Sequence, residues 1–125
     1  VIYTNPEIAC VGLTEKDLNE IHEGDFAPSM STDEPFVPYE VQQLPMTYSG
    51  RFVAENEGEM GLCKVIVDKR SKTVMGVHMI GNPCSEFVAA ASFAVRMGYT
   101  VGEFKQVVFP HPTVAEVMRE VIMEA

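Results

Sequence analysis

Residues 59–80 read EMGLCKVIVDKRSKTVMGVHMI, and this stretch decides the fold. Residues 59–68 and 73–80 both alternate with a period of two, which is typical of β-strands, and residues 69–72 between them form a turn. One face of each strand is expected to lie in the core. It consists of Cys63, Val65 and Val67 in the first strand and of Met75, Val77 and Met79 in the second. The two strands are therefore predicted to form an antiparallel hairpin.

The chain before this hairpin is predicted to contain one further strand and one helix. Residues 8–13 are strand-like, and Thr14 with Asp17 forms a capping box that predicts a short helix, which Gly24 would end. Residues 25–45 contain four prolines among serine, threonine and acidic residues. Because proline interrupts both helices and central strands, this segment is predicted to have no regular structure.

Helices dominate the chain after the hairpin. Asn82 is predicted to cap a helix that has Pro83 at its first position, runs to about Met97 and ends at Gly98. The apolar stripe expected on this helix consists of Phe87, Ala91, Ala94 and Val95.

Two shorter helices are expected to follow. Thr100 and Glu103 form a second capping box, which opens a helix through Val107. The residues that recur at helical spacing in the last helix are Val114, Val117, Met118, Val121 and Ile122. The fold class is therefore α+β, with an antiparallel β-sheet flanked by helices in one domain over residues 1–125.

Composition excludes several classes of function. Eighteen acidic residues against nine basic ones give a formal charge of −9, and no cluster of Lys or Arg could line a phosphate backbone, so nucleic acid is not an expected partner. No apolar run approaches the roughly twenty residues of a membrane span, and a soluble intracellular protein is expected. Cys10, Cys63 and Cys84 match no zinc or redox spacing, so reduced and mostly buried thiols are expected, with no metal site.

The candidate catalytic residues lie just before the last helix, in the run from Phe109 to Glu116. Pro110 and Pro112 restrict the backbone on both sides of His111, as holding a catalytic base in one place requires. With Thr113 as the helix cap, Glu116 would lean back toward His111 and accept from one ring nitrogen. The other nitrogen could then take a proton near neutral pH. The alternative is an ordinary capping box in which His111 has no chemical role.

This region also carries a family resemblance. His-Pro-Thr followed by Glu116 resembles the signature of the pyridine nucleotide-disulfide oxidoreductases, flavoenzymes that reduce or form disulfides. Residues 1–8 and 11–15 resemble the start of their dimerisation domain, and residues 61–81 resemble its central hairpin. Within the family, residues 114–120 are most similar to dihydrolipoamide dehydrogenase.

The resemblance implies a role for His111 in a homodimer. His111 and Glu116 would form an acid-base pair that enters the partner subunit's active site and takes the proton of a dihydrolipoyl thiol. His111 and Pro112 would lie against the FAD of that subunit, and the peptide bond between them would be cis. The full enzyme would convert dihydrolipoamide and NAD⁺ to lipoamide and NADH. Its further partners would be the lipoyl domains of 2-oxo acid dehydrogenase complexes, in the cytoplasm or the mitochondrial matrix.

The remaining machinery is expected elsewhere in a longer chain. No Gly-x-Gly-x-x-Gly fingerprint and no close cysteine pair occur here, so the FAD- and NAD-binding domains and the redox disulfide would lie upstream. The fragment is expected to bind neither cofactor and to be inactive alone. Two alternatives stay open: a non-catalytic self-association module, and the same domain of a glutathione or mercuric reductase.

Overall fold

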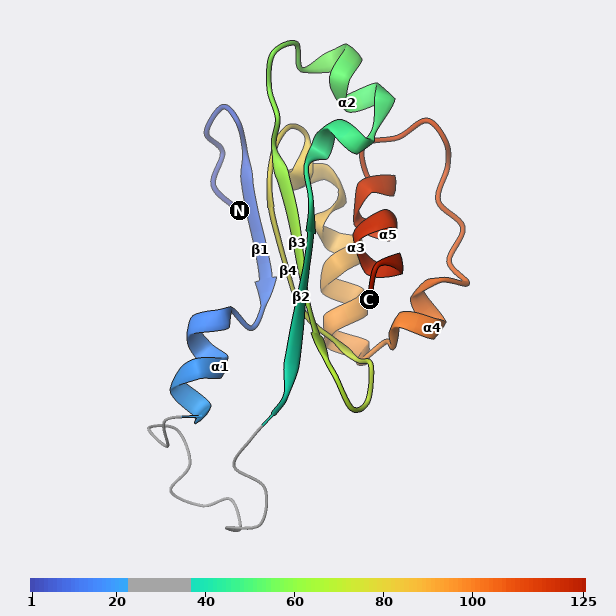
Figure 1. Cartoon of the computed structure of the whole chain (residues 1–125). Helices are drawn as coiled ribbons and strands as arrows, with labels where there is room; N and C mark the ends of the chain where they lie inside the picture. Colours follow the sequence, from blue (N-terminus) through green and yellow to red (C-terminus); the bar gives the residue numbers. More distant parts are fainter. Residues whose placement is uncertain (23–36) are drawn as a thin grey trace.

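The hairpin predicted from the sequence is the centre of the fold. The computed structural model describes residues 1–22 and 37–125, and in it β3 (Leu62–Asp68) pairs antiparallel with β4 (Val74–Ile80). β1 (Ile8–Gly12) pairs with the free edge of β4, which gives the sheet order β1-β4-β3-β2 (Figure 1). The prediction of an antiparallel α+β fold is confirmed.

The edge strand β2 (Tyr39–Leu44) corrects the prediction of irregular structure up to residue 45. Its ladder with β3 runs from Tyr39 opposite Asp68 to Leu44 opposite Cys63. Pro38 and Pro45 lie immediately outside this ladder, so they delimit the strand and remove no hydrogen bond from it. The expected end of the first helix at Gly24 and the prolines before residue 37 lie outside the described residues.

A β-bulge in β4 corrects the predicted alternation. Ile66 lies opposite Gly76, but Val67 lies opposite Val74, so Met75 is an extra residue in the ladder. Val77 and Met79 point into the core as predicted, whereas Val74 is buried in place of Met75, which is only half-buried. The period of two fails here because the inserted residue reverses the phase of the strand.

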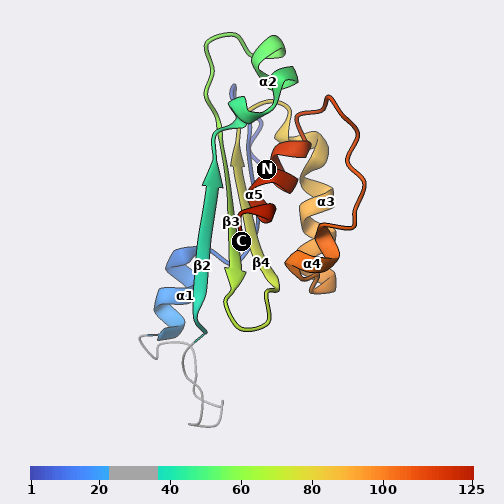
Figure 2. The same cartoon turned by 45° about the vertical axis from the view of Figure 1, so that its right-hand side comes forward.

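The helices lie on both faces of the sheet and at one end. Figure 2 shows three of them on a single face: α3 (Cys84–Met97), α4 (Val101–Phe104) and α5 (Glu116–Met123). α1 (Glu15–His22) lies on the opposite face, and α2 (Gly50–Glu55), preceded by a 3-10 turn at Met46–Tyr48, lies at the end of the sheet (Figure 1). α2 was not predicted from the sequence.

The main core lies between the sheet and the face shared by α3 and α5. The predicted stripe of α5 is confirmed, because Val114, Val117, Met118, Val121 and Ile122 are all buried. Ala91 and Ala94 of α3 are buried as well, with Phe87 and Val95 partly buried beside them. α5 therefore packs across the middle of the sheet, and its first turn is held against a rigid core.

The helix ends agree with the capping predictions in part. Both capping boxes are present, at Thr14 with Asp17 and at Thr100 with Glu103. Gly98 ends α3 in the left-handed region, as predicted. α4 ends at Phe104 rather than Val107.

Asn82 does not cap α3. Its side chain accepts from Glu7 N at 2.8 Å and donates to Asn5 Oδ1 at 2.9 Å, so it ties the segment before β1 to the loop before α3. The helix begins at Cys84, with Pro83 preceding it. The prediction was wrong because a distant segment competes for the amide group.

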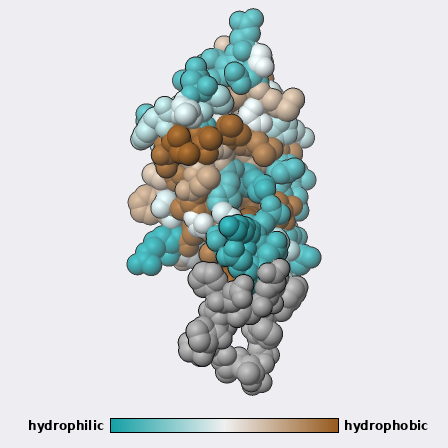
Figure 3. Space-filling view, turned by 90° about the vertical axis from the view of Figure 1, so that its left-hand side faces the viewer, coloured by the Kyte–Doolittle hydropathy of each residue, from teal (hydrophilic) through white to brown (hydrophobic). Residues whose placement is uncertain are grey.

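The face of the sheet away from α3 and α5 is only partly covered. A row of apolar side chains crosses it through the paired residues Ile2, Ile8, Ile80 and Leu62. Figure 3 shows this face, with an apolar band above a more polar region. Among residues 1–22 and 37–125, no helix is long and apolar enough to span a membrane.

Candidate functional site

The structure brings His111 and Glu116 into direct contact. Nδ1 of His111 lies 2.8 Å from Oε1 and 3.1 Å from Oε2 of Glu116. Glu116 is the first residue of α5, and its side chain leans toward the amino end of the helix. The predicted proximity of the two residues is confirmed, and their chemical role is a separate question.

Thr113 takes part in this arrangement differently from the prediction. Its backbone N–H donates to Glu116 Oε2 at 2.8 Å, which is the expected half of a capping box. Its hydroxyl, however, donates to the Pro110 carbonyl at 2.8 Å and does not cap the helix. The prediction that Thr113 caps α5 was therefore wrong for the side chain, because α5 begins only at Glu116, with Ala115 at the capping position.

The two residues of the pair differ sharply in exposure. The side chain of His111 is 80% exposed, whereas that of Glu116 is 18% exposed. With Nδ1–H donating to the carboxylate, Nε2 of the neutral ring is an acceptor. Nε2 has no hydrogen-bond partner among residues 1–22 and 37–125. The imidazole thus offers a basic nitrogen to solvent or to another molecule.

The electrostatics of Glu116 favour an ionised carboxylate. Burial opposes ionisation, but the hydrogen bonds from Thr113 N and from His111 outweigh it and lower the pKa of Glu116 below its usual range. A carboxylate that stays ionised keeps the ring proton on Nδ1 and would stabilise the imidazolium once Nε2 is protonated. The pair therefore has the charge arrangement of a general base and its orienting acid.

The backbone around the histidine also matches the resemblance. The peptide bond between His111 and Pro112 is cis, as expected. Within the same turn, Pro110 and His111 are exposed. The turn therefore projects the imidazole from the surface beside α5.

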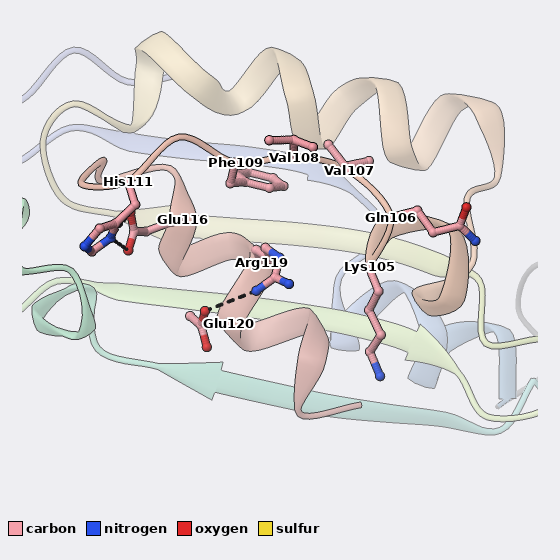
Figure 4. A pocket seen from close by; sticks show the side chains of 9 residues that line it. All are labelled: Lys105, Gln106, Val107, Val108, Phe109, His111, Glu116, Arg119 and Glu120. Atoms are coloured by element: carbon pink, nitrogen blue, oxygen red, sulfur yellow. Dashed lines mark hydrogen bonds and ion pairs between the residues drawn. The ribbon is translucent and has the colours of Figure 1, made fainter.

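An open groove of about 430 Å³ extends from His111 along α5. Figure 4 shows His111 and Glu116 at one end, Lys105 and Gln106 at the other, and Arg119 between them. The remaining lining residues are Val107, Val108, Phe109 and Glu120. This groove was not predicted from the sequence, because its walls belong to a loop and a helix whose relative placement depends on the core.

The loop that forms one wall of the groove, residues 105–110, is held by backbone hydrogen bonds from residues 105–107 to α4 and by an aromatic contact near its end. The rings of Phe104 and Phe109 lie 5.6 Å apart, and Phe109 packs against the core. Val108, one residue earlier, is 90% exposed. Val107 is 43% exposed as well, so two neighbouring apolar side chains are exposed on this wall of the groove.

Two further residues contact the turn that carries His111. Ser49, which caps α2, donates from Oγ to the Thr113 carbonyl at 2.8 Å. Arg51 Nη1 lies 3.4 Å from the Pro112 carbonyl. Neither was expected from the sequence, because more than sixty residues separate them from the turn and no local pattern reports such a contact.

The cysteines lie away from the groove. Cys63 and Cys84 are buried and Cys10 is exposed, and none of the three lines the groove among the described residues. In the same part of the chain, no group of three or more histidines, cysteines and acids could hold a metal ion.

Comparison with known proteins identifies the family. The pattern described as "Pyridine nucleotide-disulphide oxidoreductase, dimerisation domain" matches residues 1–122. The chain belongs to this family. The resemblance noted in the sequence is thereby confirmed, and so is the interpretation of the chain as a dimerisation domain.

The relatives agree with this assignment. Mitochondrial dihydrolipoyl dehydrogenase of Caenorhabditis elegans is 34% identical over 125 residues, which is 100% of this chain and 22% of that protein. Dihydrolipoyl dehydrogenase of Haloferax volcanii is 34% identical over 119 residues, 95% of this chain and 22% of that protein. The chain thus spans about a fifth of the length of the curated relatives it matches.

Solved structures of the family share the fold. The crystal structure of LpdA from Mycobacterium tuberculosis has a TM-score of 0.77 at 22% identity, over 98% of this chain and 23% of that one. The HOCl-induced flavoprotein disulfide reductase RclA from Escherichia coli has a TM-score of 0.75 at 19% identity, over 95% of this chain and 24% of that one. At these identities the likeness supports the architecture alone.

Proposed function

We propose that this domain supplies an acid-base histidine to a partner subunit in a homodimeric enzyme of the dihydrolipoamide dehydrogenase type. The observation that carries the proposal is the bond of 2.8 Å between His111 Nδ1 and Glu116 Oε1 on a ring that is 80% exposed. The ring projects beyond the domain's own surface, and no residue in 1–22 or 37–125 bonds to its Nε2. A dimerisation domain is suited to present such a ring to a second subunit.

The chemistry of the pair follows from its tautomer. Nε2 of His111 would take the proton from one thiol of dihydrolipoamide, and the resulting thiolate is the nucleophile that attacks a disulfide sulfur. Glu116, held ionised by Thr113 N and His111, would stabilise the imidazolium that forms. In the reverse direction the same imidazolium would return the proton to the thiolate that leaves.

The disulfide and the cofactors would be contributed by the rest of the full-length protein. The three cysteines lie outside the groove, and no glycine fingerprint in the chain fits the pyrophosphate of a dinucleotide, so the residues present do not fit a holder for FAD or NAD. FAD would supply electron transfer from the reduced disulfide to NAD⁺. His111 and Pro112 would border the FAD of the partner subunit, and their share of the reaction is the movement of the thiol proton.

The choice of dihydrolipoamide as substrate rests on the relatives. Proteins named dihydrolipoyl dehydrogenase match this chain at up to 34% identity over nearly its whole length. The lipoyl domains of 2-oxo acid dehydrogenase complexes would then be partners of the full-length enzyme. A glutathione or mercuric reductase, and a self-association module without catalysis, are the outcomes against which the proposal is tested.

The test is the substitution His111→Gln in the full-length protein, with NADH formation from dihydrolipoamide as the readout. We expect turnover to fall by about 10²- to 10⁴-fold, the usual contribution of a general base, with flavin content and dimer mass unchanged. His78→Gln is the matched control, since His78 contacts the Leu13 carbonyl on the opposite face of the sheet. Near-normal turnover of His111→Gln would overturn the catalytic role, and a protein without bound flavin would favour the self-association module.

A further inference from the structure

The turn at residues 110–113 is held from two sides by elements far apart in the sequence. On one side, Glu116 of α5 accepts from Thr113 N and from His111 Nδ1, both at 2.8 Å. On the other side, the carbonyls of Pro112 and Thr113 point at α2, where Arg51 and Ser49 donate to them. The donors and acceptors of the turn are therefore divided between two helices.

Ser49 is the more constrained of the two α2 residues. It is 1% exposed, and it is the buried polar residue of the described part of the chain. Its Oγ accepts from Phe52 N at 3.2 Å and donates to the Thr113 carbonyl at 2.8 Å. A hydroxyl has a single proton, so this one is fully assigned to the turn that carries His111.

α2 is anchored in the core beside this bond. Phe52 is fully buried in the main core, and Met46 of the preceding 3-10 turn is buried beside it. The hydroxyl of Ser49 therefore ties the backbone just after His111 to a helix that is anchored in the core. Arg51, itself paired with Glu55 at 2.8 Å, adds a longer contact of 3.4 Å to the Pro112 carbonyl of the same turn.

This connection matters because of how His111 is exposed. A ring that is 80% exposed has no wall of side chains to hold it, so its location depends on the backbone of the turn and on Glu116. In general a misplacement of about 1 Å in a reacting group costs about 100-fold in rate. The bonds from α2 restrict that displacement.

We propose that Ser49 is a positioning residue for His111, which fixes the turn at residues 110–113 through its bond to the Thr113 carbonyl. The inference rests on the proposed function for its catalytic consequence, but not for its structural one. Loss of the Ser49 hydroxyl frees the Thr113 carbonyl and lets the turn move relative to α2. Glu116 and the longer contact from Arg51 then have to hold the turn without Ser49.

The test compares two helix caps in the full-length protein. Ser49→Ala removes a cap and the bond to the turn, whereas Thr100→Ala removes the cap of α4 and has no contact with residues 110–113. Both variants lose a helix cap, so both should lower the thermal midpoint by a few degrees, and Ser49→Ala should lower it further because it also frees the Thr113 carbonyl. Ser49→Gly is added because glycine is itself an accepted cap, which preserves α2 while the hydroxyl is absent.

The readouts separate positioning from general damage. We expect Ser49→Ala and Ser49→Gly to lower kcat with dihydrolipoamide by about tenfold or more, with little change in KM. The oxidation of NADH by a one-electron acceptor should also change little, because that reaction needs no proton transfer from a thiol. Hydrogen exchange of the peptide that spans residues 110–115 should accelerate in both Ser49 variants and not in Thr100→Ala. Equal kcat values and equal exchange in Ser49 and Thr100 variants would overturn the inference.

Failure of the inference and failure of the proposed function give different results. If His111→Gln lowers turnover but the Ser49 variants behave like Thr100→Ala, the function stands and the positioning role is refuted. If His111→Gln has no effect, the catalytic proposal fails, and hydrogen exchange alone decides whether Ser49 holds the turn. Faster exchange confined to the Ser49 variants then supports the bond, and unchanged exchange refutes it.

Discussion

Replacing Glu116 by Gln tests the acid-base pair more sharply than removing the histidine. The amide keeps the size of the side chain and one oxygen that can still accept from Thr113 N, so the turn retains that bond. It removes the negative charge 2.8 Å from His111 Nδ1. Its amino group can instead donate to Nδ1, which moves the ring proton to Nε2, the nitrogen that has to accept.

The expected magnitude follows from the strength of this contact. A hydrogen bond to a charged group contributes about 1.5–3 kcal/mol, which corresponds to about 10- to 150-fold in rate if it is lost in the transition state. Because the ring of His111 is 80% exposed, solvent screening places the expectation near the lower end, about tenfold. The change should appear in kcat with dihydrolipoamide, since Glu116 orients the base and would not bind the substrate.

The assay is steady-state turnover of the full-length enzyme with a matched control. Glu120→Gln removes a second carboxylate from the same groove, where it lies 3.5 Å from Arg119 and does not contact His111. We expect kcat of this control to stay within about a factor of two, the usual range for an exposed pair. Equal losses in the two variants, or a loss below about threefold in Glu116→Gln, would refute the role of the pair.

Two further predictions concern stability and thiol reactivity. The pKa of Glu116 is lowered in the folded state, so its contribution to stability is full above the ordinary carboxyl range and is lost as pH falls through the lowered value. The difference in urea midpoint between the natural chain and Glu116→Gln should therefore shrink on acidification. A constant difference would contradict this. Burial raises the pKa of Cys63 to about 12, and burial and then the charge of Glu7 raise the pKa of Cys84. Cys10 is exposed, so a maleimide at neutral pH should label Cys10 first, as followed by mass spectrometry. Equal labelling rates for Cys10 and Cys63 would show that the core opens readily.

The features predicted correctly from the sequence depend on neighbours within a few residues. The hairpin of β3 and β4, the boxes at Thr14 and Thr100 and the stripe of α5 each follow from local periodicity or from a cap three residues away. The contact between His111 and Glu116 belongs to the same class, since their numbers differ by only five. Local rules suffice where the competing partners are also local.

The errors arise where a distant segment decides the outcome. Asn82 resembles a helix cap, yet its amide is taken by Asn5 and the backbone of Glu7. β2 contains no strong strand signal, and it is a strand because the edge of β3 offers it a ladder. Met75 leaves the core face because a bulge in the β3–β4 pairing reverses the alternation. In each case the tertiary partner outweighs the local preference.

The candidate site contains one local contact and one contact between distant segments, and the two should respond differently to a substitution. The bond between His111 and Glu116 is local, so it can form as soon as the first turn of α5 forms. The bond from Ser49 to Thr113 spans 64 residues and forms only when α2 is packed against the core. A substitution that loosens α2, such as Phe52→Ala with its expected cost of about 3–5 kcal/mol, should therefore release the turn while the local pair persists. Hydrogen exchange at residues 110–115 would then rise although Glu116 is intact, and unchanged exchange in a folded Phe52→Ala protein would mean that α5 alone fixes the base.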